Sequence, residues 1–242
     1  MSRKRAAIVI IGNEILSGRT LDENTQQIAL TLSKKGINIF EVRTIADEEA
    51  AIVKTVRELS AAYDYVFTTG GIGPTHDDIT AESVAKAFNL KYAINQEIYY
   101  LLRDFYLQKG QEFNEARIKM SRMPEGAKLL RSSETLAPGF NIKNVFVMAG
   151  IPKIMKTMLT SAIALLPECE LMKSKSLDVN IVEGVLAKDF GELQKKYKNV
   201  EMGSYPFSGN DKIGTSLVLR SFDDKALEEA YSKLKKMITK LC

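Results

Sequence analysis

The N-terminal part of the chain alternates short apolar runs with longer segments in which apolar residues recur at helical spacing. Residues 6–11, 37–44 and 65–69 are predicted strands, and residues 23–35 and 48–62 are predicted helices between them. A continuous apolar run such as AAIVII is typical of a strand that is buried on both faces. This order predicts a parallel sheet with right-handed crossovers and with helices on both of its faces.

The same periodicity continues to about residue 166. Helices are expected at 80–88, 96–108, 112–122 and 152–166, and strands at 127–130, 139–142 and 144–149. The last of these helices begins at Pro152, because proline fits the first turn of a helix. We therefore predict a three-layer α/β/α domain with a mostly parallel sheet over residues 1–168.

The pattern changes after a predicted linker at residues 167–176. Strands are expected at 178–185, 200–206 and 215–221, and helices at 188–198 and 223–241. Strands and helices in this order predict a small C-terminal α+β subdomain, which we place at residues 169–242.

Composition excludes several classes of function. The net charge is only +4 and the lysines are scattered, so we expect no nucleic-acid partner. One histidine and two cysteines leave no zinc site of the usual kind. Cys169 and Cys242 have no redox or metal spacing, and free thiols are typical of the cytoplasm, where we expect the protein. Apolar runs are shorter than a membrane span, so we expect no membrane partner.

The strongest candidate for chemistry is the stretch YVFTTGGIGPTHDDIT at residues 65–80. An apolar run ends there in a glycine-rich turn, and two adjacent carboxylates precede a predicted helix. Glycine backbones can approach a ligand closely, and free N–H groups at such turns and at helix N-termini attract phosphate oxygens. Asp77 and Asp78 would repel a phosphate unless a divalent cation lay between them. The stretch therefore predicts a metal–phosphate site with Asp77 and Asp78 as metal ligands.

An ordinary turn is the alternative interpretation of these residues, with Asp78 or Thr80 capping the following helix. A P-loop does not fit, because Lys and Ser/Thr would have to follow the last glycine. A dinucleotide-binding fingerprint that starts at Gly71 fails at its sixth position, which is His76. Asp47 also has two interpretations, as a carboxylate of the site or as the N-cap of the helix after it.

Polar or glycine-rich residues follow four of the predicted strands. They are Gly12-Asn13-Glu14, Asp47, residues 70–78 and residues 150–152. Ligands of open parallel sheets bind outside the carboxyl ends of the strands. We therefore expect these four segments to line one shared cleft.

These motifs together resemble the molybdopterin-binding fold family and, within it, the CinA type (competence/damage-inducible protein A). The matching segments are IGNEILSG at 11–18 with Asn24 behind it, TTGGIGPTHDDIT at 68–80, MPEGA at 123–127, APGF at 137–140, AGIP at 149–152 and GSYP at 203–206. The N-terminal domain of eukaryotic FAD synthase is similar. Two segments depart from the CinA pattern: LPGVPxEM reads MAGIPKIM at 148–155, and GTAPG reads TLAPG at 135–139.

The resemblance implies a metal-dependent nucleotide pyrophosphatase that acts on a dinucleotide such as ADP-ribose or FAD. The implied cofactor is a divalent metal, Mg, Mn or Co, and the implied catalytic acids are Asp47 and Asp78, to which we add Glu14. An enzyme of molybdenum cofactor biosynthesis that binds and adenylylates molybdopterin is the second hypothesis. A non-catalytic nucleotide-binding protein is the third.

The expected partner is a small nucleotide or pterin, whose phosphates would be held by glycines, hydroxyls and one lysine. The expected binding residues are Gly12, Asn24, Thr69, Gly70, Gly71, Gly73, Thr75, Thr80, Lys119, Pro138, Gly139, Gly150 and Pro152. Tyr99, Tyr100, Phe105 and Tyr106 recur at helical spacing and belong either to the core or to a dimer face. We expect a homo-oligomer.

Overall fold

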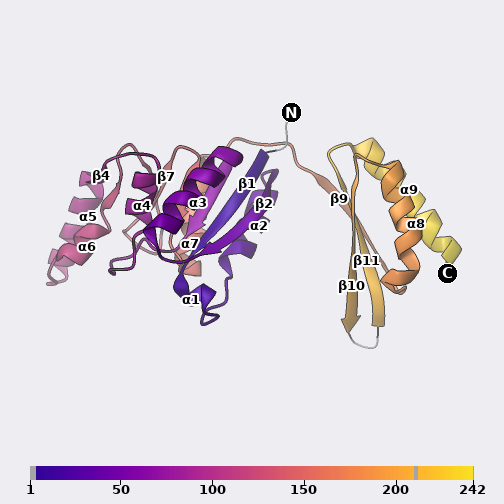
Figure 1. The fold of residues 1–242 in the computed structure, drawn as a ribbon, viewed down its shortest axis with the longest axis horizontal. Coiled ribbons are helices and arrows are strands. Elements are labelled where there is room, and N and C mark those ends of the chain that lie inside the picture. Colours follow the sequence, from indigo (N-terminus) through magenta and orange to yellow (C-terminus); the bar gives the residue numbers. More distant parts are fainter. Residues whose placement is uncertain (1–3, 210–211, 242) are drawn as a thin grey trace. The chain divides into compact units, whose positions relative to one another are not determined.

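The computed structural model describes residues 4–209 and 212–241, which form two compact units, Met1–Cys169 and Glu170–Cys242 (Figure 1). The first unit encloses two buried apolar clusters and the second encloses one, so each unit is described by itself. Within the described ranges, no helix combines the length and the apolar character needed to cross a membrane.

The first unit is built on a six-stranded sheet with the strand order β2-β1-β3-β8-β7-β6. Its parallel strands are β1 (Lys4–Ile11), β2 (Ile37–Ile45), β3 (Tyr65–Thr69) and β8 (Val145–Met148). Two antiparallel strands complete one edge, β7 (Gly139–Ile142) and β6 (Lys128–Leu130). The predicted mostly parallel sheet is confirmed.

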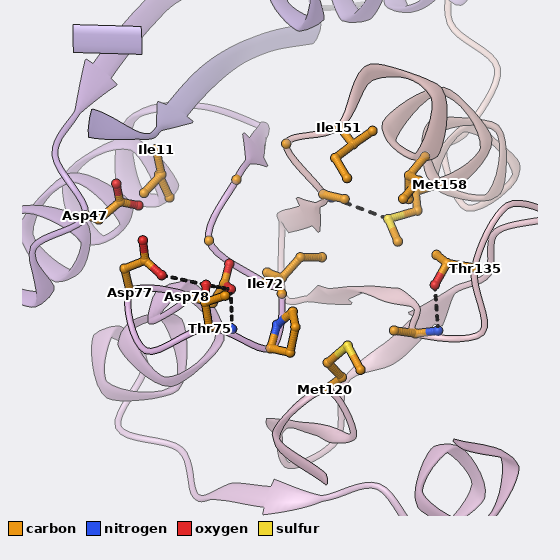
Figure 2. Close-up of a pocket in the computed structure, with 18 of the residues that line it drawn as sticks. Ile11, Asp47, Ile72, Thr75, Asp77, Asp78, Met120, Thr135, Ile151 and Met158 are labelled. Atoms are coloured by element: carbon orange, nitrogen blue, oxygen red, sulfur yellow. Dashed lines mark hydrogen bonds between the residues drawn. The ribbon is translucent and has the colours of Figure 1, made fainter. Parts of the chain in front are cut away.

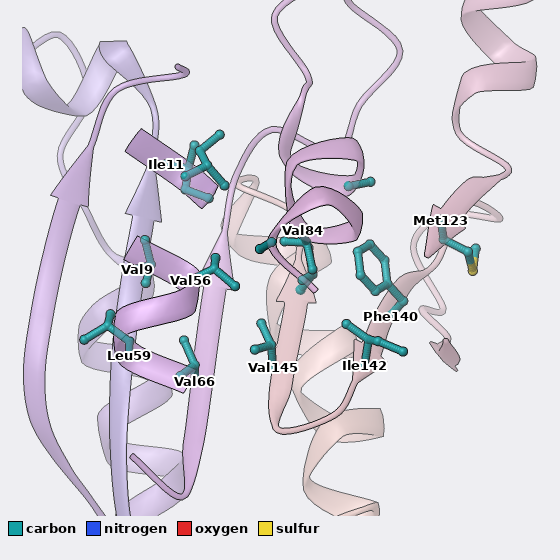
Figure 3. Packing of buried hydrophobic residues seen from close by; sticks show 14 of the residues in the cluster. Val9, Ile11, Val56, Leu59, Val66, Val84, Met123, Phe140, Ile142 and Val145 are labelled. Carbon is teal, nitrogen blue, oxygen red and sulfur yellow. The ribbon is translucent and has the colours of Figure 1, made fainter. Parts of the chain in front are cut away.

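Helices cover both faces of this sheet because alternate residues of β1 point to opposite sides. Ala7, Val9 and Ile11 pack in a cluster with α3 (Glu49–Ala62) and α4 (Thr80–Ala87), part of which is drawn in Figure 3. Ala6, Ile8 and Ile10 belong to the cluster that contains α2 (Asn24–Ser33) and α7 (Pro152–Ala164). The three-layer α/β/α arrangement is therefore present.

Short elements connect these layers. The sequence pattern did not predict α1 (Asn13–Leu16) or the two-stranded sheet of β4 (Tyr92–Ile94) and β5 (Arg122–Pro124). Of the predicted helices, α5 spans Gln96–Gln108, whereas the one expected at 112–122 is only α6 (Glu115–Lys119). Asn114 accepts a hydrogen bond from the Arg117 amide and so starts α6 later than its apolar residues suggest.

The second unit is a three-stranded antiparallel sheet with two helices packed on it. The strand order is β10 (Glu201–Gly209), β11 (Lys212–Ser221) and β9 (Lys173–Val179). The helices α8 (Glu183–Lys196) and α9 (Asp224–Leu241) contribute the buried residues Leu186, Phe190, Leu193, Leu227 and Leu234. The predicted α+β character of this region is confirmed.

The prediction was wrong about the bounds of the first strand and the first helix of this unit. The strand expected at 178–185 is β9 at 173–179, which begins inside the predicted linker, and α8 begins at Glu183 rather than at 188. β9 has the sequence KSKSLDV with only Val179 buried, so its pairing with β11 decides its position more than its hydrophobicity does. The apolar residues just after it lead into α8, where Leu186 is buried.

Asn144 joins the start of β8 to the end of α3, and its removal should destabilise the first unit. Its Nδ2 atom donates to the carbonyls of Ser60 and Tyr63 at 3.0 Å each, and its Oδ1 accepts from the Ser60 hydroxyl at 2.6 Å. A net hydrogen bond contributes roughly 1 kcal/mol, so Asn144→Ala should lower the free energy of unfolding by about 2–3 kcal/mol in urea titrations. The exposed control Lys128→Ala should stay within about 0.5 kcal/mol of the wild type. Equal stabilities for the two variants would contradict the proposed role of Asn144.

Candidate functional site

The segments that follow β1, β2, β3 and β8 meet at one edge of the sheet and line a single pocket (Figure 2). Its volume is about 430 Å³. The expected site residues in its wall are Glu14, Asp47, Gly70, Gly71, Gly73, Thr75, Asp77, Asp78 and Gly150. The expected shared cleft at the carboxyl ends of the parallel strands is therefore present.

Gly70 lies where the backbone leaves β3, and it can only be a glycine. Its φ is +104°, and a Cβ atom there would lie 2.0 Å from the carbonyl oxygen of Ile11. Its N–H donates to the carbonyl of Met148 at 3.1 Å, so this amide is engaged by the sheet. The expected role of Gly70 as an amide donor to phosphate is therefore wrong, and its contribution is to let the strands approach one another.

The turn after Gly70 is closed by hydrogen bonds from Thr75. The Thr75 amide donates to Oδ2 of Asp78 at 2.8 Å, and its hydroxyl donates to Oδ1 of Asp77 at 2.5 Å and also contacts Asp78 Oδ2. The helix α4 begins after Ile79, so the Asp78 carboxylate closes the turn and does not cap the helix. An Asp78 helix cap, the alternative interpretation of this stretch, is therefore not what the structure shows.

The pKa of Asp77 is lowered from its ordinary value, first by the hydrogen bond from the Thr75 hydroxyl and then by a backbone hydrogen bond. Electrostatic interactions with His76 and Lys119 contribute smaller decreases. A hydrogen bond to a carboxylate favours its ionised form, so Asp77 carries a negative charge in this pocket at neutral pH.

Asp47 connects the loop after β2 to the loop after β1. Its Oδ2 accepts a hydrogen bond from the Asn13 amide at 2.8 Å, whereas α3 starts only after Glu48. The N-cap interpretation of Asp47 is therefore wrong. Glu14 lies in α1, directly after Asn13, and its carboxylate is so close to Gly12 that a Cβ there would be 2.6 Å from both Oε atoms. Both acids line the pocket.

A smaller cavity of about 50 Å³ lies beside the pocket and takes in Asn24, Thr69 and Pro152, together with Glu14 and Gly150. Nδ2 of Asn24 donates to the carbonyl of Gly150 at 2.7 Å and to the Thr69 hydroxyl at 3.4 Å. Asn24 therefore ties the start of α2 to the exits of β3 and β8. These residues support the pocket wall from behind.

Lys119 and Pro138 line a third small cavity, which Gly73 and Asp78 also line. The Lys119 ammonium donates to the carbonyl of Thr75, so this cation is held against the turn that carries the two aspartates.

Three expected site residues serve the fold and lie outside the pocket wall. The Gly12 amide donates to Ile45 at 3.2 Å, and a Cβ on Gly139 would lie 2.4 Å from the Val147 carbonyl oxygen. Thr80 is fully buried under Gly71, and its hydroxyl has no hydrogen-bond partner among the described residues. The positions of these three residues in the sequence did not show that they lie outside the pocket wall.

Sequence reasoning missed the apolar wall of the pocket. This wall contains Ile72, Pro74, Met120, Ile151, Ile154 and Met158. In Figure 2 the carboxylates of Asp47, Asp77 and Asp78 gather at one side of the pocket, and Met120, Thr135 and Met158 lie at the other. The signal in the sequence was Ile151, an apolar residue between a glycine and a proline. In the structure this residue is 61% exposed. Such a wall suits a flat ring next to the charged end of a ligand.

Residues 7–168 match the model of a family described as a probable molybdopterin binding domain. The chain belongs to this molybdopterin-binding family. Residues 172–242 match a second model, described as the FAD synthase middle domain. The resemblance that the motifs predicted is confirmed.

Relatives match between two thirds and nearly all of this chain. A protein of Archaeoglobus fulgidus is 33% identical over 225 residues, which cover 90% of this chain and 96% of that protein. A probable FAD synthase of Caenorhabditis elegans is 31% identical over 260 residues, covering 98% of this chain but only 50% of that protein. The solved structure of CinA from Thermoplasma acidophilum matches with a TM-score of 0.62 and 28% identity, covering 66% of this chain and 96% of that one.

The molybdopterin-binding family often uses divalent metals, and the acids of this pocket suit one that arrives with phosphate. The described residues contain no group of three or more His, Cys, Asp or Glu side chains that could hold a metal on their own. Mg²⁺ is usually held by one or two carboxylates together with water and substrate phosphates. Asp77 and Asp78, joined through Thr75, provide such a pair.

The close approach at Gly70 should make this position intolerant of any side chain. Gly70→Ala would place a Cβ against the backbone of Ile11 and would keep an unfavourable φ, so we expect a loss of about 3 kcal/mol in the free energy of unfolding. Gly18 is a matched control, because its φ is +72° and no atom lies within 4 Å of its Cβ position. Gly18→Ala should cost about 1 kcal/mol in the same urea titration. Similar costs at both positions would refute a tight contact at Gly70.

Proposed function

We propose that this protein hydrolyses the phosphoanhydride bond of a dinucleotide such as ADP-ribose or FAD with the help of a divalent metal. The observation that carries the proposal is the placement of four carboxylates and a glycine turn on one pocket. Membership of a family that binds nucleotide or pterin ligands supports it, and so does the similarity to probable FAD synthases.

The glycine turn would bind the diphosphate. Among the described residues, the amides of Gly71 and Gly73 donate no backbone hydrogen bond, so they are free to donate to phosphate oxygens. Such fixed donors stabilise the charge that develops on phosphate oxygens during hydrolysis. Lys119, held on the carbonyl of Thr75, adds a positive charge next to the turn.

Asp77 and Asp78 would hold the metal together with the phosphate oxygens. When bound, a divalent metal neutralises phosphate charge and lowers the pKa of a coordinated water. The Thr75 amide and hydroxyl keep the two aspartates oriented towards the same place before the ligand arrives. This orientation lowers the entropy cost of assembling the site.

Asp47 and Glu14 would act on the attacking water from the segments that follow β2 and β1. Asp47 is oriented by the Asn13 amide, so one carboxylate oxygen is fixed and the other can accept a proton. Glu14 lies in α1, close to Gly12, and can hold the water or the metal.

A pterin ligand is the second candidate, and the description of the matching family favours it. The apolar wall of Ile72, Met120, Ile151 and Met158 would accept a pterin ring, and the glycine turn would bind its phosphate. This function differs from hydrolysis in its products: incubation with molybdopterin and ATP would release pyrophosphate, whereas dinucleotides would remain intact.

Replacement of the two principal acids should abolish turnover and spare the fold. Asp47→Asn and Asp78→Asn keep the size of each side chain but remove the charge that binds the metal or accepts a proton. We expect kcat/KM for ADP-ribose or FAD with Mg²⁺, Mn²⁺ or Co²⁺ to fall by about 1000-fold, measured by chromatography of the mononucleotide products.

The control for this experiment is Asp178→Asn, because Asp178 is an exposed aspartate on β9 in the other unit. It should retain wild-type activity, and all three variants should melt at similar temperatures. Full activity in both Asp47→Asn and Asp78→Asn would show that the acids are misassigned, and a wild type inactive with all three metals would remove the hydrolase proposal.

Ligand binding should depend on the metal even if no product forms. A ligand at 100 times its Kd stabilises the folded state by about 2.7 kcal/mol, so ADP-ribose with Mn²⁺ should raise the melting temperature of the wild type. EDTA should abolish most of this rise, and Asp77→Asn should weaken it. A rise of equal size in EDTA would exclude a metal role, and a metal-dependent rise without hydrolysis would favour a non-catalytic nucleotide-binding protein.

A further inference from the structure

A second large cavity, of about 350 Å³, adjoins the pocket and has no part in the chemistry described above. The two spaces share Met120, Thr135 and Ala137 as lining residues. Figure 2 shows Met120 and Thr135 at the side of the pocket that lies away from Asp47. The second cavity therefore continues the pocket beyond its apolar end.

The wall of this cavity combines apolar and hydroxyl groups. Leu102, Phe105 and Tyr106 of α5 form one side, and the loop at residues 132–137 forms the other. This combination of aromatic rings with a few polar groups is characteristic of small-molecule sites in proteins.

Both sides of the cavity are held by contacts of their own. The Arg117 guanidinium lies 3.9 Å from the centre of the Tyr106 ring, which also stacks on Phe113 with centroids 6.2 Å apart. On the loop, the hydroxyls of Ser132 and Thr157 lie 2.6 Å apart and so tie the loop to α7. The cavity is therefore preformed, which lowers the entropy cost of binding a ligand there.

The size of the two spaces matches a ligand with two halves. Ligand sites usually measure about 300–1,000 Å³, and each space alone lies near the lower end of that range. A diphosphate on the glycine turn would leave one half of a dinucleotide beside Ile151 and Ile154. The other half would pass Met120 and Thr135, which line both spaces, and the flexible methionine side chain can adjust to it.

We propose that this second cavity binds the nucleobase of a dinucleotide whose diphosphate occupies the glycine turn. The proposal rests on the proposed function and adds the place of the base. A planar heteroaromatic ring would lie between Phe105, Leu136 and Met120. Such rings pack favourably on aromatic and sulfur-containing side chains. Ser133 and Glu134 at the cavity wall supply oxygen atoms that can accept a hydrogen bond from an exocyclic amino group.

Filling the cavity tests the proposal. Ser133 lines it and is exposed, so Ser133→Trp would place an indole in the space without removing a buried group. Ser174→Trp on β9 is the matched control, because Ser174 is an exposed serine of the other unit. Calorimetric titrations with Mg²⁺ would use ADP-ribose, which carries a base, and ribose 5-phosphate, which carries none.

Ser133→Trp should weaken the binding of ADP-ribose by at least tenfold and leave the Kd of ribose 5-phosphate within twofold of wild type. Phe105→Ala, which removes a ring from the wall, should weaken only ADP-ribose. If Ser133→Trp bound ADP-ribose with the wild-type Kd, the base site would be overturned. Hydrolysis of ADP-ribose, measured separately, would in that case still uphold the proposed function. Base-dependent binding without hydrolysis would uphold the base site and refute the hydrolase, and a wild type that does not bind ADP-ribose would overturn both.

Discussion

The structure depends on one close approach between backbones at the carboxyl edge of the parallel sheet. A Cβ atom on Gly70 would lie 2.0 Å from the carbonyl oxygen of Ile11, and one on Gly150 would lie 3.4 Å from Gly70 Cα. The exit of β3 can approach β1 this closely only because residue 70 is a glycine, whereas a Cβ on Gly150 would make an ordinary van der Waals contact. The loops then diverge from this point, and their divergence opens the pocket in which the acids and the glycine turn face one another.

The acids at this edge are held by uncharged donors, unlike carboxylates elsewhere in the first unit. Asp64 is paired with Lys4 at 2.7 Å, and Glu41 with Arg43 at 2.5 Å. Within the described ranges, Glu14, Asp47 and Asp78 form no ion pair with a lysine or an arginine. Backbone amides orient Asp47 and Asp78 without neutralising them, so negative charge accumulates in the pocket. A cation that binds there gains the full attraction of these acids, which fits a metal that arrives with an anionic ligand.

The sequence predicted the elements that hydrophobic periodicity determines. The strands of β1, β3 and β8, the glycine turn and the meeting of four strand exits followed from local patterns, because buried parallel strands read as apolar runs. Long-range pairing decided the rest. β9 is a polar edge strand whose position is fixed by its partner β11. The hydrogen bond from the Gly70 amide to the Met148 carbonyl depends on β8, which lies far along the chain. The apolar wall could not be predicted either, since Met120 and Ile154 come from different helices or their ends.

Thr75 shows why the two adjacent aspartates belong to one site. Its hydroxyl contacts oxygens of both Asp77 and Asp78 but has a single proton, so it can donate to only one of them at a time. The Thr75 amide supplies a second hydrogen bond to Asp78, yet both side chains remain acceptors that converge on the same hydroxyl. The hydrogen bond from Thr75 lowers the pKa of Asp77 and so favours its ionised form, and a second carboxylate held this close would repel it. In the proposed function, Asp77 and Asp78 would hold a divalent cation, and its positive charge would offset this repulsion and the negative charge of a phosphate ligand.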